Sequence, residues 1–287
     1  MKTLLGLIRK PDKSQNMIKY LVELARDLDA NAHLLFVENP IHHPLGTPDL
    51  SGAAVAQLQK SLEEKVKEGK QLITGLVTKM TPHIAGEVVI DVSSEVGNEV
   101  TIIDEMVQSG KVQMVAIEYS EMNGFWLKDS AAKDIVRNID CPVWVIPEKT
   151  VYHSFHSIIY ATDYNEEDIS TLRKLIDLTH NSSPQINALH ITDNADFNLR
   201  IKNAGFQKML ETKTEYTNIS VKALVERSGD DMVKLINSYA AMKNADLIVV
   251  LKKNRNFLDR IFNPSSSEKI IQKAEKPVLV YHANDKK

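Results

Sequence analysis

The segment Met114-Val-Ala-Ile-Glu118 is followed further on by Cys141-Pro-Val-Trp-Val-Ile-Pro147. This pattern indicates the fold of the chain because it recurs between Val249 and Tyr281. Each copy is an apolar run, a longer polar segment, and a proline followed by a second apolar run. Ser130 and Ser265 are 135 residues apart, and Pro142 and Pro277 have the same separation. A constant offset of this length predicts a duplicated domain rather than a short solenoid repeat.

Apolar runs alternate with helical patterns along both halves. The runs predict strands at 3–8, 32–37, 87–92, 112–117 and 143–146, and again at 157–162, 185–191, 219–225, 246–251 and 277–281. Helices are predicted at 15–28, capped by Ser14, at 52–80, 100–107, 130–138, 167–178, 195–213 and 231–243, and from about Pro264. Strands that are continuously apolar and joined by helices are typical of a parallel sheet covered on both faces. The fold class predicted is therefore α/β, with two doubly wound parallel five-stranded sheets in tandem, over residues 1–148 and 154–283.

The first half is longer than the second. A proline-rich loop at 39–49 and the long helix at 52–80 account for the extra residues. The apolar residues expected on the buried side of that helix are Val55, Leu58, Leu62, Val66, Leu72, Ile73 and Leu76. The loop contains the adjacent histidines His42 and His43. Two histidines could bind a metal ion only together with further ligands from elsewhere in the chain.

Composition restricts the class of protein. The chain has 287 residues, of which 43% are hydrophobic and 25% charged, which is typical of a soluble globular protein. The N-terminal apolar run is too short for a signal peptide and no run is long enough to cross a membrane, so we expect a cytoplasmic protein. A net charge of −3 argues against a nucleic-acid surface. Cys141 stands alone, which excludes an internal disulfide and a CxxC site, and we expect it to be buried.

Four segments of the second half carry a family resemblance: Ile158-Ile-Tyr-Ala-Thr-Asp163, Ala188-Leu-His-Ile191, Ala245-Asp-Leu-Ile-Val-Val250 and Lys276-Pro-Val-Leu-Val280. In order and spacing they resemble the universal stress protein family, and the first half resembles it more weakly. The whole chain therefore is similar to a tandem universal stress protein. The resemblance implies an intramolecular pseudo-dimer in which the closing strands at 143–146 and 278–281 pair, and it leaves a further homodimer open.

In nucleotide-binding members of that family, the acid ending the first strand contacts adenine, and a glycine-rich loop ending in Ser or Thr holds the phosphates at a helix start. Asp163 matches the acid, but its first-half counterpart is Arg9. The loop from Leu251 to Ser265 contains no glycine, and the corresponding first-half loop has only Gly124. That second-half loop is basic, with Lys252, Lys253, Arg255 and Arg260. The resemblance and these charges together give the candidates for holding an adenine nucleotide such as ATP: Asp163, Ile191, Lys252, Asn254, Ser265, Ser266 and Ser267.

Three functions are compatible with these features. The one favoured is a non-catalytic, stress-response or regulatory protein whose first-half ligand site is degenerate, because no catalytic motif occurs in context. The first alternative is an ATP-binding, slowly hydrolysing stress protein that uses the second half. The second alternative is a metal or small-molecule sensor acting through His42 and His43.

Overall fold

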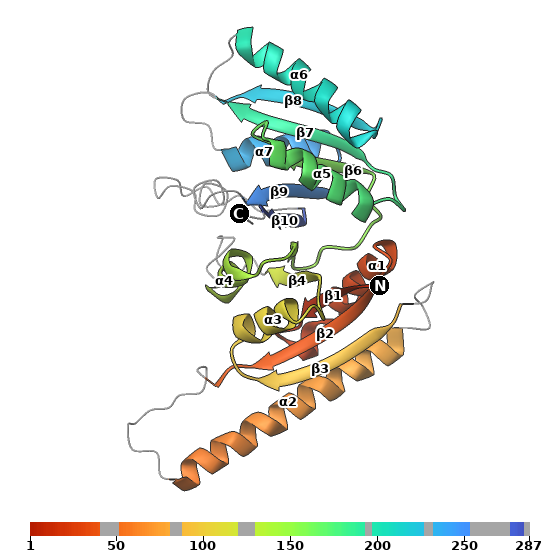
Figure 1. Ribbon diagram of the computed structural model, residues 1–287. Helices are drawn as coiled ribbons and strands as arrows, with labels where there is room; N and C mark the ends of the chain where they lie inside the picture. The colour runs from red at the N-terminus through yellow and green to blue at the C-terminus, as the bar shows by residue number, and fades with distance from the viewer. Residues whose placement is uncertain are drawn as a thin grey trace. The chain divides into compact units, whose positions relative to one another are not determined.

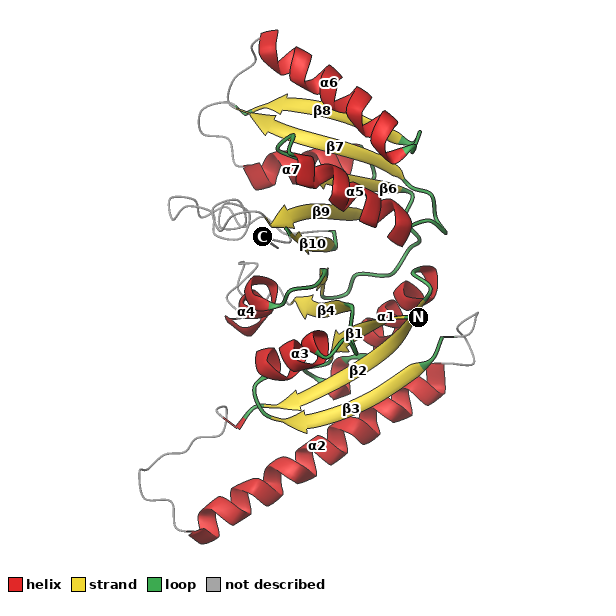
Figure 2. Cartoon of the chain, viewed as in Figure 1, coloured by secondary structure: helices red, strands yellow, loops and turns green. Residues whose placement is uncertain are grey.

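A computed structural model of the chain describes residues 1–40, 52–80, 88–119, 130–192, 197–226, 232–252 and 276–283 (Figure 1). The chain divides into two compact units. Unit 1 comprises Met1–Glu118 and Ala131–Cys141, and unit 2 comprises Tyr119–Ser130 and Pro142–Lys287. Each unit is a sheet with helices packed against it, as the strands and helices in Figure 2 show.

The sheet of unit 1 is parallel and has the strand order β3-β2-β1-β4. Its strands are β1 (Lys2–Leu7), β2 (Ala30–Glu38), β3 (Ile90–Val96) and β4 (Met114–Tyr119). The central strands β1 and β4 are almost completely buried. Strand β3 begins later than the run at 87–92 predicts, because its ladder with β2 extends from Ile90 to Val96. This edge strand is only partly buried and accepts the polar residues Ser93, Ser94 and Glu95.

The helical elements of unit 1 are η1 (Pro11–Lys13), α1 (Gln15–Asp27), α2 (Gly52–Met80), α3 (Glu99–Gln108) and α4 (Ser130–Asn138). Helix α1 packs a buried apolar stripe, including Ile18, Leu21 and Ala25, against the sheet. Ser14 occupies the position before α1, but the prediction that its side chain caps the helix is wrong. Its hydroxyl instead donates a hydrogen bond to the carbonyl of Pro11, which η1 brings within 2.9 Å.

Helix α2 runs along β2 and β3 (Figure 1). Leu62, Gly69 and Ile73 lie on its buried side. Gly69 contacts the Phe36 ring so closely that an added Cβ would lie 2.4 Å from it. Two residues expected on the buried side are not there, since Val55 is 48% and Leu72 is 51% exposed. The helical spacing from Leu62 through Gly69 to Ile73 turns both of them away from the sheet.

Unit 2 has the strand order β5-β10-β9-β6-β7-β8. Its strands are β5 (Val143–Pro147), β6 (Ser157–Ala161), β7 (Gln185–Thr192), β8 (Ile219–Val225), β9 (Leu247–Lys252) and β10 (Val278–His282). Its described helices are α5 (Glu166–Leu178), α6 (Phe197–Thr214) and α7 (Met232–Met242).

The closing strand of the first repeat belongs to the sheet of unit 2. β5 pairs antiparallel with β10, with Trp144 opposite Leu279, whereas the other described pairs of this sheet are parallel. The tandem α/β fold class is confirmed, and the antiparallel pair lies between the closing strands of the two repeats. The antiparallel pair satisfies the backbone groups of two apolar strands that would otherwise be sheet edges.

Candidate functional site

Three candidate residues come together at the carboxyl edge of the unit 2 sheet. Ala161, the last residue of β6, is level with Leu189 on β7 and Val250 on β9. The residues two positions further along these three chain segments are Asp163, Ile191 and Lys252, so all three lie at the same edge of the sheet. This edge, at the ends of adjacent parallel strands, is where open α/β sheets commonly bind ligands.

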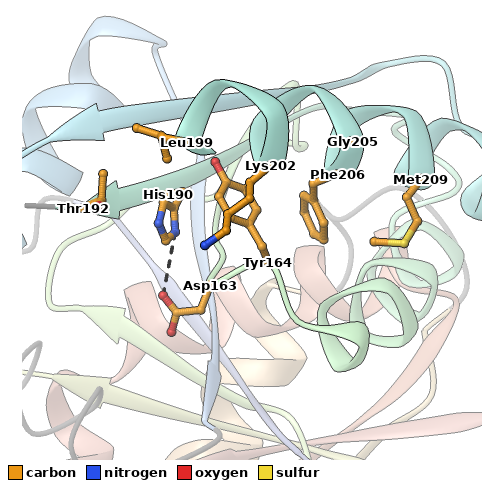
Figure 3. Close-up of a pocket in the computed structure, with 9 residues that line it drawn as sticks. All are labelled: Asp163, Tyr164, His190, Thr192, Leu199, Lys202, Gly205, Phe206 and Met209. Atoms are coloured by element: carbon orange, nitrogen blue, oxygen red, sulfur yellow. Dashed lines mark ion pairs between the residues drawn. The ribbon is translucent and has the colours of Figure 1, made fainter. Parts of the chain in front are cut away.

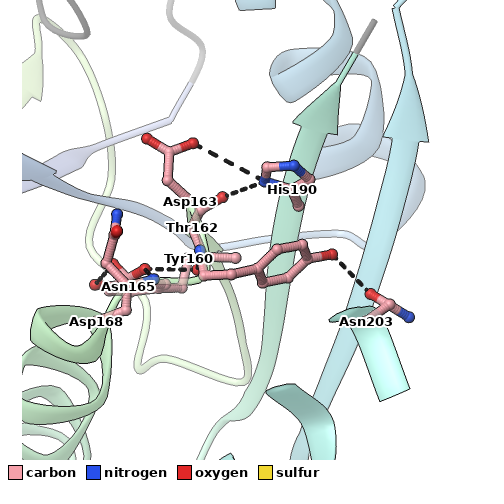
Figure 4. Close-up of polar contacts among 8 residues, drawn as sticks. Tyr160, Thr162, Asp163, Asn165, Asp168, His190 and Asn203 are labelled. Atoms are coloured by element: carbon pink, nitrogen blue, oxygen red, sulfur yellow. Dashed lines mark hydrogen bonds and ion pairs between the residues drawn. The ribbon is translucent and has the colours of Figure 1, made fainter. Parts of the chain in front are cut away.

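A buried carboxylate shapes the turn that presents Asp163 (Figure 4). The Tyr160 hydroxyl donates to Asp168 Oδ1 at 2.9 Å, and the Thr162 hydroxyl donates to Asp168 Oδ2 at 2.7 Å. The Asn165 backbone N–H also donates to Asp168 Oδ2, at 3.0 Å, and completes a capping box at the start of α5. Burial raises the pKa of Asp168, and these hydrogen bonds to the ionised form offset part of the rise. The network ties the end of β6 to α5.

Tyr164 follows Asp163 and adopts a left-handed backbone conformation, with φ at 60°. This conformation is uncommon for a residue with a side chain. Its ring packs between His190, at a centroid distance of 4.2 Å, and Phe206 on α6, at 5.0 Å. Its hydroxyl donates to Asn203 Oδ1 at 2.9 Å. Burial raises the pKa of Tyr164 to about 12, so the phenol stays protonated at neutral pH.

A pocket of about 610 Å³ opens between this turn, the end of β7 and α6 (Figure 3). The residues that line it are Asp163, Tyr164, His190, Thr192, Leu199, Lys202, Gly205, Phe206 and Met209. It combines aromatic rings with one exposed carboxylate and a lysine that extends from α6 (Figure 3). Such a mixture fits a ligand with a planar apolar part and polar or charged groups.

His190 has a defined orientation in this pocket. Its Nδ1 lies 2.8 Å from the Thr162 carbonyl oxygen and 3.9 Å from Asp163 Oδ1. A carbonyl oxygen only accepts hydrogen bonds, so Nδ1 carries the proton, and in the neutral ring Nε2 is the acceptor. The Asp163 side chain is 60% exposed, whereas that of His190 is 17% exposed. Asp163 is therefore the acceptor that a ligand can reach.

The corresponding position of unit 1 is chemically different. Arg9 follows β1 as Asp163 follows β6, and its Nη2 donates to Glu99 Oε2 on α3 at 3.0 Å. Both side chains are largely buried, with 23% and 14% of their surface exposed. Asn98 caps α3 by accepting a hydrogen bond from the Thr101 N–H, which holds Glu99 in the first helical turn. An internal ion pair therefore replaces the exposed carboxylate of unit 2.

Several candidate positions lie outside the described residues: the pair His42 and His43, the loop residues Gly124 and Asn254, the serines Ser265, Ser266 and Ser267, and the helix predicted from Pro264. Among the residues described, no cluster of three or more His, Cys, Asp or Glu side chains is arranged to hold a metal ion. Cys141 is buried, as expected, and burial raises the pKa of its thiol to about 12.

Sequence reasoning missed Tyr164, Lys202 and Phe206. Tyr164 is adjacent to the predicted Asp163, but an aromatic residue after a strand carries no signal of a left-handed turn. Lys202 and Phe206 lie on a helix whose link to the sheet is visible only in the folded chain. His190 was within the quoted segment Ala188-Leu-His-Ile191 and could have been found, because it precedes a strand end next to β6.

A model of the universal stress protein family matches residues 1–147 and, a second time, residues 154–282. The chain belongs to the universal stress protein family. Its two matched regions make it a tandem universal stress protein. A search of curated proteins found no matching relative. None of the helices in the described part of the chain is long and apolar enough to span a membrane.

Solved structures resemble this universal stress protein along nearly its whole length. A universal stress protein from Archaeoglobus fulgidus DSM 4304 has 17% identity and a TM-score of 0.65, over 99% of this chain and 97% of that one. A protein of unknown function from Pseudomonas aeruginosa PAO1 has 16% identity and a TM-score of 0.59, over 99% of this chain and 94% of that one. The cytoplasmic domain of a prokaryotic cation chloride cotransporter has 12% identity and a TM-score of 0.50, over 97% of this chain and 94% of that one. At these identities the likeness concerns the fold alone.

Proposed function

We propose that this chain is a non-catalytic, cytoplasmic regulatory protein that binds an adenine nucleotide in its second repeat, while its first repeat has a structural role. One observation carries the proposal. Asp163 is 60% exposed at the mouth of a pocket, whereas its first-repeat counterpart Arg9 is engaged in an ion pair with Glu99. At the position after the first strand, the second repeat therefore presents an exposed carboxylate, whereas the first repeat has a paired guanidinium.

Each part of the pocket has a role in this proposal. The carboxylate of Asp163 accepts a hydrogen bond from the exocyclic amine of adenine, since an ionised carboxylate only accepts. The packed rings of Tyr164, His190 and Phe206 form an aromatic wall of the pocket against which a planar base can lie. Lys202 on α6 and Lys252 at the end of β9 supply positive charge for the phosphates, a task that glycine amides perform in other sites of this kind.

Calorimetric titration of the purified chain with ATP, ADP and adenosine tests the proposal. We expect saturable binding by the unmodified chain and a loss of about tenfold or more in affinity for Asp163→Ala. Asp12→Ala removes an exposed carboxylate from unit 1 and is the matched control, with unchanged affinity expected. If both the unmodified chain and Asp163→Ala give no heat of binding at millimolar nucleotide, the proposed function is wrong.

A phosphate-release assay separates binding from hydrolysis. We expect ATP to remain intact when incubated with the protein, because no catalytic motif occurs in context in the sequence. Turnover by the unmodified chain that Asp163→Ala abolishes would instead establish the slowly hydrolysing alternative.

A further inference from the structure

The side of α2 that faces away from the sheet carries an unusual set of residues. A groove runs along it, lined by Glu68, Gln71, Leu72, Gly75, Leu76 and Lys79. Glu68, Leu72, Gly75 and Lys79 recur at alternating spacings of four and three, so they form one stripe along the helix. This stripe is distinct from the buried side at Leu62, Gly69 and Ile73.

Leu72 and Gly75 lie on the exposed side of α2. Leu72 is 51% exposed, and a Cβ added to Gly75 would meet no atom within 4 Å. A glycine inside a helix lowers its stability relative to alanine, and here no close packing within the described chain compensates for that loss. Glycine instead leaves a depression on the helix surface that a second helix can approach closely.

The stripe is complementary to itself. Glu68 and Lys79 lie at equal distances along the helix from the midpoint between Ile73 and Thr74, and Leu72 and Gly75 share this midpoint. If two copies of α2 pack antiparallel with a twofold axis at that point, Leu72 of each copy lies opposite Gly75 of the other. Glu68 of each copy then lies opposite Lys79 of the other, and the twofold axis produces every contact twice.

The charges at the two ends are available for such contacts. Neither Glu68 nor Lys79 has a hydrogen bond or ion pair with any residue in the described part of the chain. In a parallel pair of helices, by contrast, Glu68 would face Glu68 and Lys79 would face Lys79. The charges of Glu68 and Lys79 therefore favour an antiparallel pair of helices over a parallel pair.

We propose that the outer stripe of α2, consisting of Glu68, Gln71, Leu72, Gly75, Leu76 and Lys79, is a docking surface for a second copy of this chain. The helices cross antiparallel, with the Leu72 side chain of each copy placed over Gly75 of the other. Because one helical face buries little area, this dimer is weak and forms in the micromolar range. The surface lies on a helix that is longer in the first repeat than in the second, since α2 has 29 residues and α6 has 18. This proposal is independent of nucleotide binding.

Sedimentation velocity of the full chain tests it over a range of micromolar concentrations. We expect the mass to rise from 32.3 kDa toward twice that value. Glu68→Lys and Lys79→Glu each convert two attractive contacts into two repulsive ones, so each weakens association by about tenfold. The double variant with both changes restores attraction in the antiparallel register and brings the dissociation constant back to near its original value.

A second variant keeps the test independent of helix stability. Gly75→Gln fills the depression with a better helix former, so the melting temperature rises while dimerisation is lost. A chain that stays monomeric at all concentrations overturns the proposal. So does a dimer whose dissociation constant is insensitive to the single charge reversals, or one that the double variant fails to rescue.

Discussion

The Arg9 guanidinium donates to the Glu99 carboxylate at 3.0 Å, at the position where the second repeat exposes the carboxylate of Asp163. The two repeats thus use one strand end for two purposes. In unit 1 the strand end is tied to α3, and in unit 2 it forms the mouth of a pocket.

A double-mutant cycle measures how much the ion pair between Arg9 and Glu99 contributes to stability. Arg9→Ala, Glu99→Ala and the double variant are expected to yield a coupling free energy of about 0.5–1 kcal/mol in urea unfolding, because the pair retains some contact with water. The exposed pair Lys60 and Glu64, with nitrogen and oxygen 4.0 Å apart, is the control and should show almost no coupling. Equal couplings in the two cycles would contradict a stabilising role for the Arg9 contact.

Removing the Asp168 carboxylate should destabilise unit 2 strongly. Asp168→Ala leaves the hydroxyls of Tyr160 and Thr162 without their acceptor in a buried site, and we expect a loss of about 3 kcal/mol or more. Tyr160→Phe removes one donor and its ring stays in place, so the loss should be only about 1 kcal/mol. Chemical denaturation of the three proteins gives both values, and equal losses would show that the carboxylate is not the centre of the network.

The pH dependence of stability has a definite sign at Asp168. Its pKa in the folded chain lies above the ordinary value of 3.8, so the native state binds the proton more tightly than the unfolded chain does. This group's contribution to stability therefore rises as the pH falls through the raised pKa, and it is lost as the pH rises through the same range. The difference in unfolding free energy between the unmodified chain and Asp168→Asn should decrease as the pH rises above the ordinary carboxyl pKa of 3.8. A difference that grows with pH would require a lowered pKa.

Two glycines of α2 should respond in opposite directions to the same substitution. Gly69→Ala forces a Cβ to within 2.4 Å of the Phe36 ring, which we expect to cost about 1–3 kcal/mol. Gly75→Ala meets no atom within 4 Å, so at concentrations where the chain is monomeric it should stabilise by about 0.5–1 kcal/mol. Thermal unfolding of both variants provides the comparison, and each is the control for the other. Shifts of the same sign would contradict the packing of α2 described above.

Tyr164 has two separable contributions. Tyr164→Phe loses only the hydrogen bond to Asn203, so we expect a cost of about 1 kcal/mol in stability and an unchanged affinity for adenosine. Tyr164→Ala also loses the ring next to His190, and affinity should fall by about fivefold or more if the base stacks there. Equilibrium unfolding and calorimetric titration measure the two effects. Equal affinities for the alanine and phenylalanine variants would exclude stacking on this ring.

The amino-acid pattern predicted the elements of the fold closely. The helix at Gly52–Met80 and the helix at Ser130–Asn138 have the predicted bounds. Apolar periodicity reports which face of a helix or strand is buried, and this information is local. Strand β3 was placed less well, because pairing with β2 rather than its own composition sets its extent.

The candidate site was predicted only in part. The repeat and the strand ends indicated Asp163, Ile191 and Lys252, because parallel strands end at one edge of a sheet. Tyr164, Lys202 and Phe206 reach the pocket through a left-handed turn and through the packing of α6, neither of which leaves a periodic pattern in the sequence.

Two repeats can be recognised in the amino-acid pattern, each an alternation of strands and helices, with an acid after the first strand of one repeat and an arginine after the first strand of the other. The contacts of those two residues follow from the folded chain. The tertiary structure tied Arg9 to Glu99, left Asp163 exposed beside His190, and joined β5 to β10. The physical reason is that strand and helix formation depends on neighbouring residues, whereas a pocket, an ion pair and a strand pairing depend on residues far apart in the chain.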